Sequence, residues 1–82
     1  MDRTKVFEQV IAILKPFTKA PEALAAAGME TSILGDLKIN SARLVDVVLE
    51  IEDRFGFEVK DAEADKVRTV GDAVNLILSH AA

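Results

Sequence analysis

Apolar residues spaced three and four positions apart predict an amphipathic helix at the start of the chain, from Asp2 to Lys15. Pro16 follows directly, and proline lacks an amide hydrogen and disfavours helical geometry in the residue before it. We therefore expect the helix to stop or kink there. Its apolar positions are Val6, Phe7, Val10, Ile11, Ile13, Leu14 and Phe17.

Residues 17–40 form a long connection that we predict to be mostly loop. Pro21 is suited to a helix start, and Gly28 after an alanine-rich run is suited to a helix stop, so one short helical segment is allowed. A connection of this length is uncommon in a small domain unless it spans the molecule or carries function.

A second long helix is predicted from Asn40 or Ser41 to about Phe55. Either residue is able to cap it by accepting a hydrogen bond from an amide of the first turn, and Gly56 is able to end it in the left-handed conformation. Its inward stripe is predicted to consist of Leu44, Val48, Ile51 and Phe55, with Val45 and Leu49 beside it.

The remaining pattern predicts a short and a medium helix. Asp61 is suited to cap a helix from Ala62 to about Lys66, and Thr69 with Asp72 three residues later is typical of a helix start. We therefore expect an all-α fold, a small four-helix bundle of three longer helices plus a short third helix. The apolar stripe of the last helix is Val70, Val74, Ile77 and Leu78.

Composition narrows the function. A length of 82 residues indicates a single domain over 1–82, and half of the residues are apolar. The net charge of −4 argues against nucleic acid as a partner and favours a partner with a basic surface. No cysteine is present, so disulfides and thiolate zinc ligands are excluded. No secretory signal pattern and no apolar run near the roughly 20 residues of a membrane span occur, so we expect a cytoplasmic protein without a transmembrane segment. We also expect a monomer.

Ser41 is the residue best placed for chemistry. It follows a loop at the first turn of a helix, where the positive end of the helix dipole favours a phosphate ester. Serine is also a common N-cap, so the local sequence leaves both interpretations open.

The stretch from Asp36 to Ile77 resembles the acyl carrier protein family without a gap. The family's acidic-Leu pair, Asp-Ser-Leu motif and acidic helix ending in Phe are matched by GDLKINSARLVDVVLEIEDRF. Its later loop, short third helix and Thr-Val start of the fourth helix are similar to FEVKDAEADKVRTVGDAVNLI. The resemblance implies a 4′-phosphopantetheine arm on Ser41 that carries acyl intermediates as thioesters in fatty-acid, lipid or related biosynthesis, and no catalysis by the chain itself.

The resemblance also implies partners and the residues that contact them. The partners are a phosphopantetheinyl transferase and acyl-transfer or lipid-synthesis enzymes with basic docking patches. Asp46, Glu52 and Asp53 fall on the acidic positions that face partners in the family, and Asn40 and Ala42 lie beside the attachment point. Glu50 joins them because its spacing places it on one helix face with Asp46 and Asp53. Residues implied to line an acyl pocket are Val45, Leu49, Ile51, Val59, Val67, Ala73 and Ile77. By pattern alone, the acids are also typical of a solvated helix face and the apolar residues of an ordinary core.

Three residues depart from the family pattern. Asn40 and Ala42 replace the Asp and Leu that flank the serine, and Arg43 replaces an acid. These departures leave open a dedicated transferase, or an unmodified acyl-carrier-like protein–protein interaction module. A peptidyl or aminoacyl carrier is a further alternative, although the acidic second long helix is more typical of an acyl carrier.

The sequence also allows a calcium loop and a serine hydrolase site to be considered, and it argues against both. Asp61, Glu63 and Asp65 match a calcium loop, but Lys66 stands where that loop needs glycine. A serine hydrolase needs a base, and the only histidine, His80, lies near the end of the chain. We predict neither a metal site nor a hydrolase.

Overall fold

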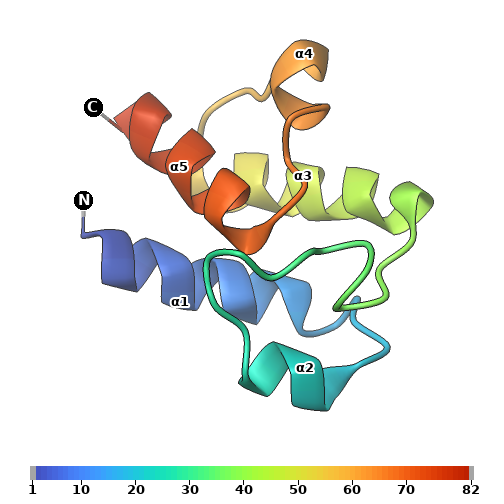
Figure 1. The fold of residues 1–82 in the computed structure, drawn as a ribbon. Helices are drawn as coiled ribbons and strands as arrows, with labels where there is room; N and C mark the ends of the chain where they lie inside the picture. Colours follow the sequence, from blue (N-terminus) through green and yellow to red (C-terminus); the bar gives the residue numbers. More distant parts are fainter. Residues whose placement is uncertain (1, 82) are drawn as a thin grey trace.

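The computed structural model describes residues 2–81, which form five helices and no strand (Figure 1). The helices are α1 Arg3–Leu14, α2 Pro21–Ala25, α3 Ser41–Phe55, α4 Asp61–Ala64 and α5 Val70–Ala81. The three long helices and the short α4 confirm the predicted all-α architecture. The very short α2 lies in the long connection, where one helical segment was allowed.

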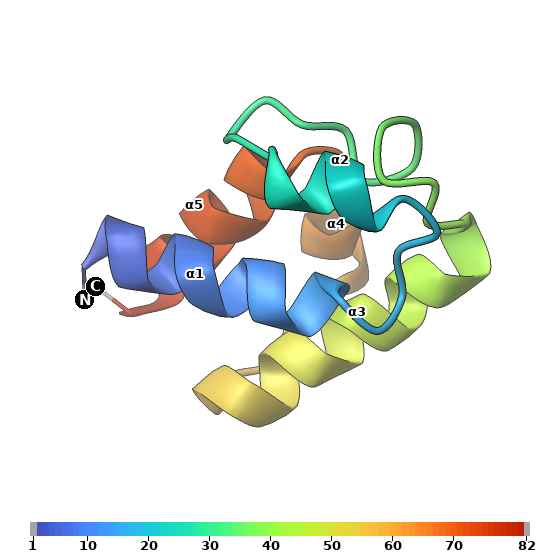
Figure 2. The same cartoon turned by 90° about the horizontal axis from the view of Figure 1, so that it is seen from below.

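The core forms where α1 packs against α5 and, less extensively, against α3 (Figures 1 and 2). Val10 and Leu14 of α1 and Val74 and Ile77 of α5 are fully buried. At the surface, the guanidinium of Arg3 donates to the side-chain oxygen of Asn75 at 3.0 Å, which joins α1 to α5. No helix in the part of the chain that the structure describes is long and apolar enough to cross a membrane.

The ends of α1 agree with the sequence. The side chain of Asp2 accepts a hydrogen bond from the amide of Thr4 at 3.0 Å and so caps the helix. The last helical residue is Leu14, two positions before Pro16. The predicted stop at the proline is confirmed.

The long connection contributes more to the core than its loop-like sequence indicated. Ile33, Leu37 and Ile39 are buried although they belong to no helix. The amide of Ile33 donates to the carbonyl of Arg68 at 3.0 Å, next to an isolated β-bridge between Ser32 and Thr69. The connection therefore spans the molecule and fastens the segment that leads into α5.

The start of α5 is confirmed, whereas that of α4 differs from the prediction. Thr69 Oγ1 accepts from the amide of Asp72 at 3.1 Å, and Asp72 Oδ2 accepts from the amide of Thr69 at 3.0 Å. In α4, Lys60 is the N-cap, and its amide donates to Glu63 Oε1 at 3.2 Å. The prediction that Asp61 caps this helix was wrong, because the cap comes one residue earlier and Glu63 reaches back to it.

The predicted inward stripe of α3 is confirmed and is wider than expected. Val48 and Ile51 are buried, Leu44 and Phe55 are partly buried against the core, and Val47 is buried as well. Val45 and Leu49 lie beside the stripe but are 59% and 54% exposed, because these two side chains border an open groove instead of another helix. The left-handed helix end at Gly56 (φ 75°) is confirmed.

Candidate functional site

Ser41 is the first residue of α3 and is exposed to solvent. Asn40 is the N-cap, because its side-chain oxygen accepts a hydrogen bond from the amide of Arg43 at 2.9 Å. The hydroxyl of Ser41 makes no hydrogen bond within residues 2–81. Of the two capping residues that the sequence allowed, Asn40 therefore takes this role and leaves the Ser41 oxygen available for an ester.

The position of Ser41 fits a phosphate ester. The amides that open a helix have no intrahelical partners, and the positive end of the helix dipole attracts an anion there. The α3 helix runs for 15 residues, so this dipole is fully developed. The guanidinium of Arg43, two residues after Ser41, contacts Asp46 Oδ2 at 3.0 Å in an exposed pair.

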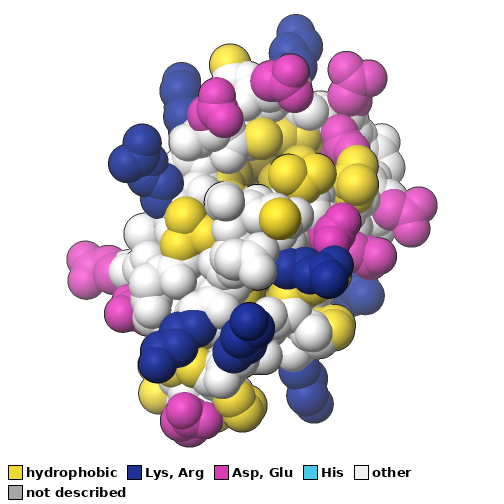
Figure 3. Space-filling model, turned by 90° about the vertical axis from the view of Figure 1, so that its right-hand side faces the viewer, with side chains coloured by type: hydrophobic (Ala, Val, Ile, Leu, Met, Phe, Trp, Pro, Cys, Tyr) yellow, Lys and Arg dark blue, Asp and Glu magenta, His cyan; other side chains and the backbone are white. Residues whose placement is uncertain are grey.

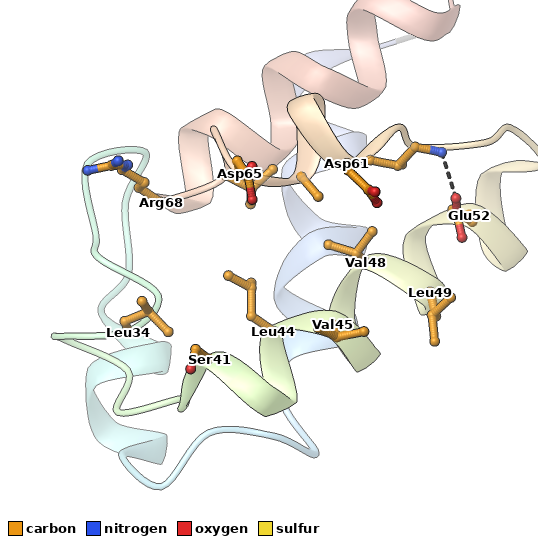
Figure 4. A pocket seen from close by; sticks show the side chains of 13 residues that line it. Leu34, Ser41, Leu44, Val45, Val48, Leu49, Glu52, Asp61, Asp65 and Arg68 are labelled. Carbon is orange, nitrogen blue, oxygen red and sulfur yellow. Dashed lines mark hydrogen bonds between the residues drawn. The ribbon is translucent and has the colours of Figure 1, made fainter.

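An open groove of about 600 Å³ begins at Ser41 and runs between α3 and the α4 region (Figure 4). Figure 3 shows hydrophobic side chains gathered around a hollow on this side of the molecule, with acidic side chains along its upper and right-hand edges. The groove residues are Leu34, Ser41, Leu44, Val45, Val48, Leu49, Glu52, Val59, Asp61, Ala64, Asp65, Val67 and Arg68.

Four of the residues that the family resemblance assigned to an acyl pocket line this groove, namely Val45, Leu49, Val59 and Val67. The other three lie in the closed core, where Ile51, Ala73 and Ile77 are fully buried. Helical periodicity does not distinguish a residue of a groove wall from a residue of the core, because both kinds of face carry apolar residues at the same spacing.

Several groove residues were not predicted from the sequence. Leu34 stands in the long connection, outside any periodic pattern, and is 45% exposed. Leu44 and Val48 were assigned to the inward stripe of α3, yet they also border the groove. The exposure of a large aliphatic side chain such as Leu34 marks the wall of the groove, and this exposure can be seen only in the folded structure.

Some of the predicted partner-facing residues are exposed, and one of them makes a hydrogen bond within the protein. Glu50 and Asp53 are exposed on α3, and Ala42 is exposed beside Ser41. Glu52 is half-buried, and its Oε2 accepts from the amide of Val59 at 2.6 Å. The structure thus leaves two acids of the C-terminal half of α3 without a hydrogen bond in residues 2–81, while Glu52 joins α3 to the loop before α4.

The C-terminal end of α5 holds α4 in place through His80. His80 Nε2 lies 2.8 Å from Glu63 Oε2, and the ring of Phe57 stacks on the imidazole with 4.2 Å between ring centroids. The amide of Lys60 and then His80 lower the pKa of the Glu63 carboxyl from its ordinary value of 4.5. These contacts could not be predicted from the sequence, because the partners of His80 are 17 and 23 residues away along the chain.

Comparison with known proteins identifies the family. Residues 8–77 match the family model described as the phosphopantetheine attachment site. The chain is 36% identical over 80 residues to an acyl carrier protein of Coprothermobacter proteolyticus, a match that covers 98% of this chain and 95% of that protein. That relative is named as a carrier, which agrees with the expectation that the chain is not an enzyme.

Two further relatives are longer than the matched region. An acyl carrier protein of Lactobacillus acidophilus is 50% identical over 50 residues, which are 61% of this chain and 62% of that protein. The mitochondrial acyl carrier protein 2 of Arabidopsis thaliana is 34% identical over 80 residues, which are 98% of this chain and 62% of that protein. The chain therefore spans somewhat less than two thirds of these two relatives. Together with the family model, these matches show that the chain belongs to the acyl carrier protein family, whose cofactor is phosphopantetheine.

Proposed function

We propose that this protein is an acyl carrier whose 4′-phosphopantetheine arm is attached to the hydroxyl oxygen of Ser41. The observation that carries the proposal is the exposed Ser41 hydroxyl, which stands without a hydrogen bond in residues 2–81 at the mouth of an apolar groove. Asn40 caps α3 in its place, so an ester on Ser41 costs the helix no capping interaction. When attached, the arm supplies a thiol that holds acyl groups as thioesters.

Attachment is a phosphoryl transfer onto Ser41. The serine oxygen forms a bond to a phosphorus of the coenzyme A diphosphate, and the bond from that phosphorus to the bridging oxygen breaks. Adenosine bisphosphate leaves, and the hydroxyl proton passes to a base on the transferase. The first-turn amides of α3 stabilise the negative charge of the resulting phosphodiester.

The groove and the acids of α3 have separate roles in this proposal. Apolar side chains such as Val45 and Leu49 cover part of the acyl chain while it waits for the next enzyme. Glu50 and Asp53 face basic patches on the transferase and on acyl-transfer or lipid-synthesis enzymes, and the transferase also contacts Asn40 and Ala42 beside Ser41. Service in fatty-acid, lipid or related biosynthesis, the monomeric state and the cytoplasmic location stay predictions.

Intact-protein mass spectrometry tests the attachment site. The chain purified from its native host, and the chain treated with a phosphopantetheinyl transferase and coenzyme A, should each gain the mass of one phosphopantetheine. Ser41→Ala should gain none, whereas Ser79→Ala, which removes an exposed serine of α5, should be modified like the wild type. An unmodified native chain that purified transferases also leave unchanged would instead support the unmodified interaction module.

A further inference from the structure

A hydrogen bond bridges the groove at the end that lies farthest from Ser41. The groove follows α3 from Ser41 to Glu52 (Figure 4). At the far end, the side chain of Glu52 reaches across to the loop before α4, where Oε2 accepts from the amide of Val59 at 2.6 Å. This hydrogen bond links the two walls of the groove beyond Leu49.

The α3 wall of the groove is apolar until it reaches Glu52. It carries Leu44, Val45, Val48 and Leu49 in turn, and Glu52 follows at the far end (Figure 4). An aliphatic chain gains stability along the apolar stretch by leaving water. Beyond that stretch the chain would have to desolvate the polar end of the Glu52 side chain, which opposes further burial.

Passage beyond Glu52 also requires the hydrogen bond to break. Val59 is only 8% exposed, so its amide has little access to water as a replacement partner. A donor left without an acceptor in such a place is costly. We therefore propose that Glu52 is a specificity-determining residue that limits the length of the acyl chain covered by the groove. This inference rests on the proposed attachment of the arm to Ser41.

The experiment compares chains of different length on wild-type, Glu52→Ala, Glu52→Gln and Glu58→Ala proteins. A transferase loads each protein with butanoyl-, octanoyl- and dodecanoyl-phosphopantetheine from the matching acyl-coenzyme A. Mass spectrometry follows the cleavage of each thioester by hydroxylamine, because a chain that lies in the groove shields its thioester. For each variant, the cleavage rates of the three acyl forms are compared with one another. Any loss of stability affects all three forms of that variant and does not change their ratio.

In the wild type, cleavage should slow from butanoyl to octanoyl and slow no further for dodecanoyl. In Glu52→Ala the dodecanoyl thioester should be cleaved about tenfold more slowly than in the wild type, since one charge-assisted hydrogen bond no longer opposes the longer chain. Glu52→Gln keeps an oxygen that accepts from Val59 and should keep the wild-type limit. Glu58 is exposed and does not border the groove, so Glu58→Ala should also behave like the wild type.

Equal dodecanoyl-to-octanoyl ratios in all four proteins would overturn the inference, and so would a Glu52→Gln protein that behaves like Glu52→Ala. These outcomes require that loading succeeded, so they leave the proposed function standing. If no protein is loaded on Ser41, the proposed function fails first, and the role of Glu52 falls with it.

Discussion

The carboxamide oxygen of Asn40 lies 2.9 Å from the amide nitrogen of Arg43, so the cap of α3 belongs to the residue before Ser41. Asn40→Ala should lower the free energy of unfolding by about 1 kcal/mol, because an amide of the first turn loses its acceptor. Asn40→Asp should retain the cap. Urea unfolding followed by circular dichroism measures the difference.

Ser41→Ala is the matched control for that prediction. Ser41 is exposed and makes no hydrogen bond in the described residues, so its replacement should change the free energy of unfolding by less than about 0.5 kcal/mol. Equal losses in Asn40→Ala and Ser41→Ala would show that the two residues share the capping role.

Gly71 marks the closest approach between α5 and the long connection. A Cβ atom at this position would lie 2.6 Å from the carbonyl oxygen of Met29, which also accepts the Gly71 amide at 2.7 Å. Gly71→Ala should therefore destabilise the protein by about 1–3 kcal/mol despite the higher helix propensity of alanine. A Cβ at Gly28 would meet nothing within 4 Å, so Gly28→Ala should be nearly neutral. Thermal unfolding of both variants and the wild type measures the difference.

The lowered pKa of Glu63 makes part of the stability dependent on pH. Because the Lys60 amide and His80 hold this pKa below 4.5, the ionised carboxylate stabilises the folded state at pH values above 4.5, and this contribution is lost as the pH falls through the folded-state pKa. Glu63→Gln should be less stable than the wild type near neutral pH, and the difference should shrink in acid. Urea unfolding at a series of pH values measures it; a difference that grows in acid would contradict the assignment.

The exposed acids of α3 should control association with the transferase. Glu50→Lys and Asp53→Lys together should lower kcat/KM for arm attachment by about tenfold at low ionic strength, with a smaller effect in high salt. Glu8→Lys is the control because it also removes an exposed acid, but on α1, and it changes the net charge by half as much as the double variant. A loss of about threefold in Glu8→Lys would indicate dependence on net charge, and a salt-independent loss in the double variant would argue against electrostatic steering.

The order of the helices and most of their ends could be predicted because their causes are local. Pro16 ends α1 through its missing amide, Gly56 ends α3 through its positive φ, and Thr69 and Asp72 begin α5 through contacts three residues apart. Ser41 could be identified as a candidate site from the sequence for a similar reason, since neighbouring residues show that it lies at a loop-to-helix junction. The family followed from the same stretch of chain.

The remaining features depend on contacts between residues distant in sequence. The burial of Ile33 and Leu37, the exposure of Val45 and Leu49, and the contact of Glu63 with His80 all depend on which elements meet after folding. Apolar periodicity shows which face of a helix avoids water, but it does not show whether that face meets a closed core or an open groove. The sequence by itself thus determined the helices, their ends and the serine, because these depend on local backbone chemistry. Only the tertiary structure decided which apolar residues form the groove and that Glu52 bonds to Val59 at its far end, because those outcomes depend on packing across the molecule.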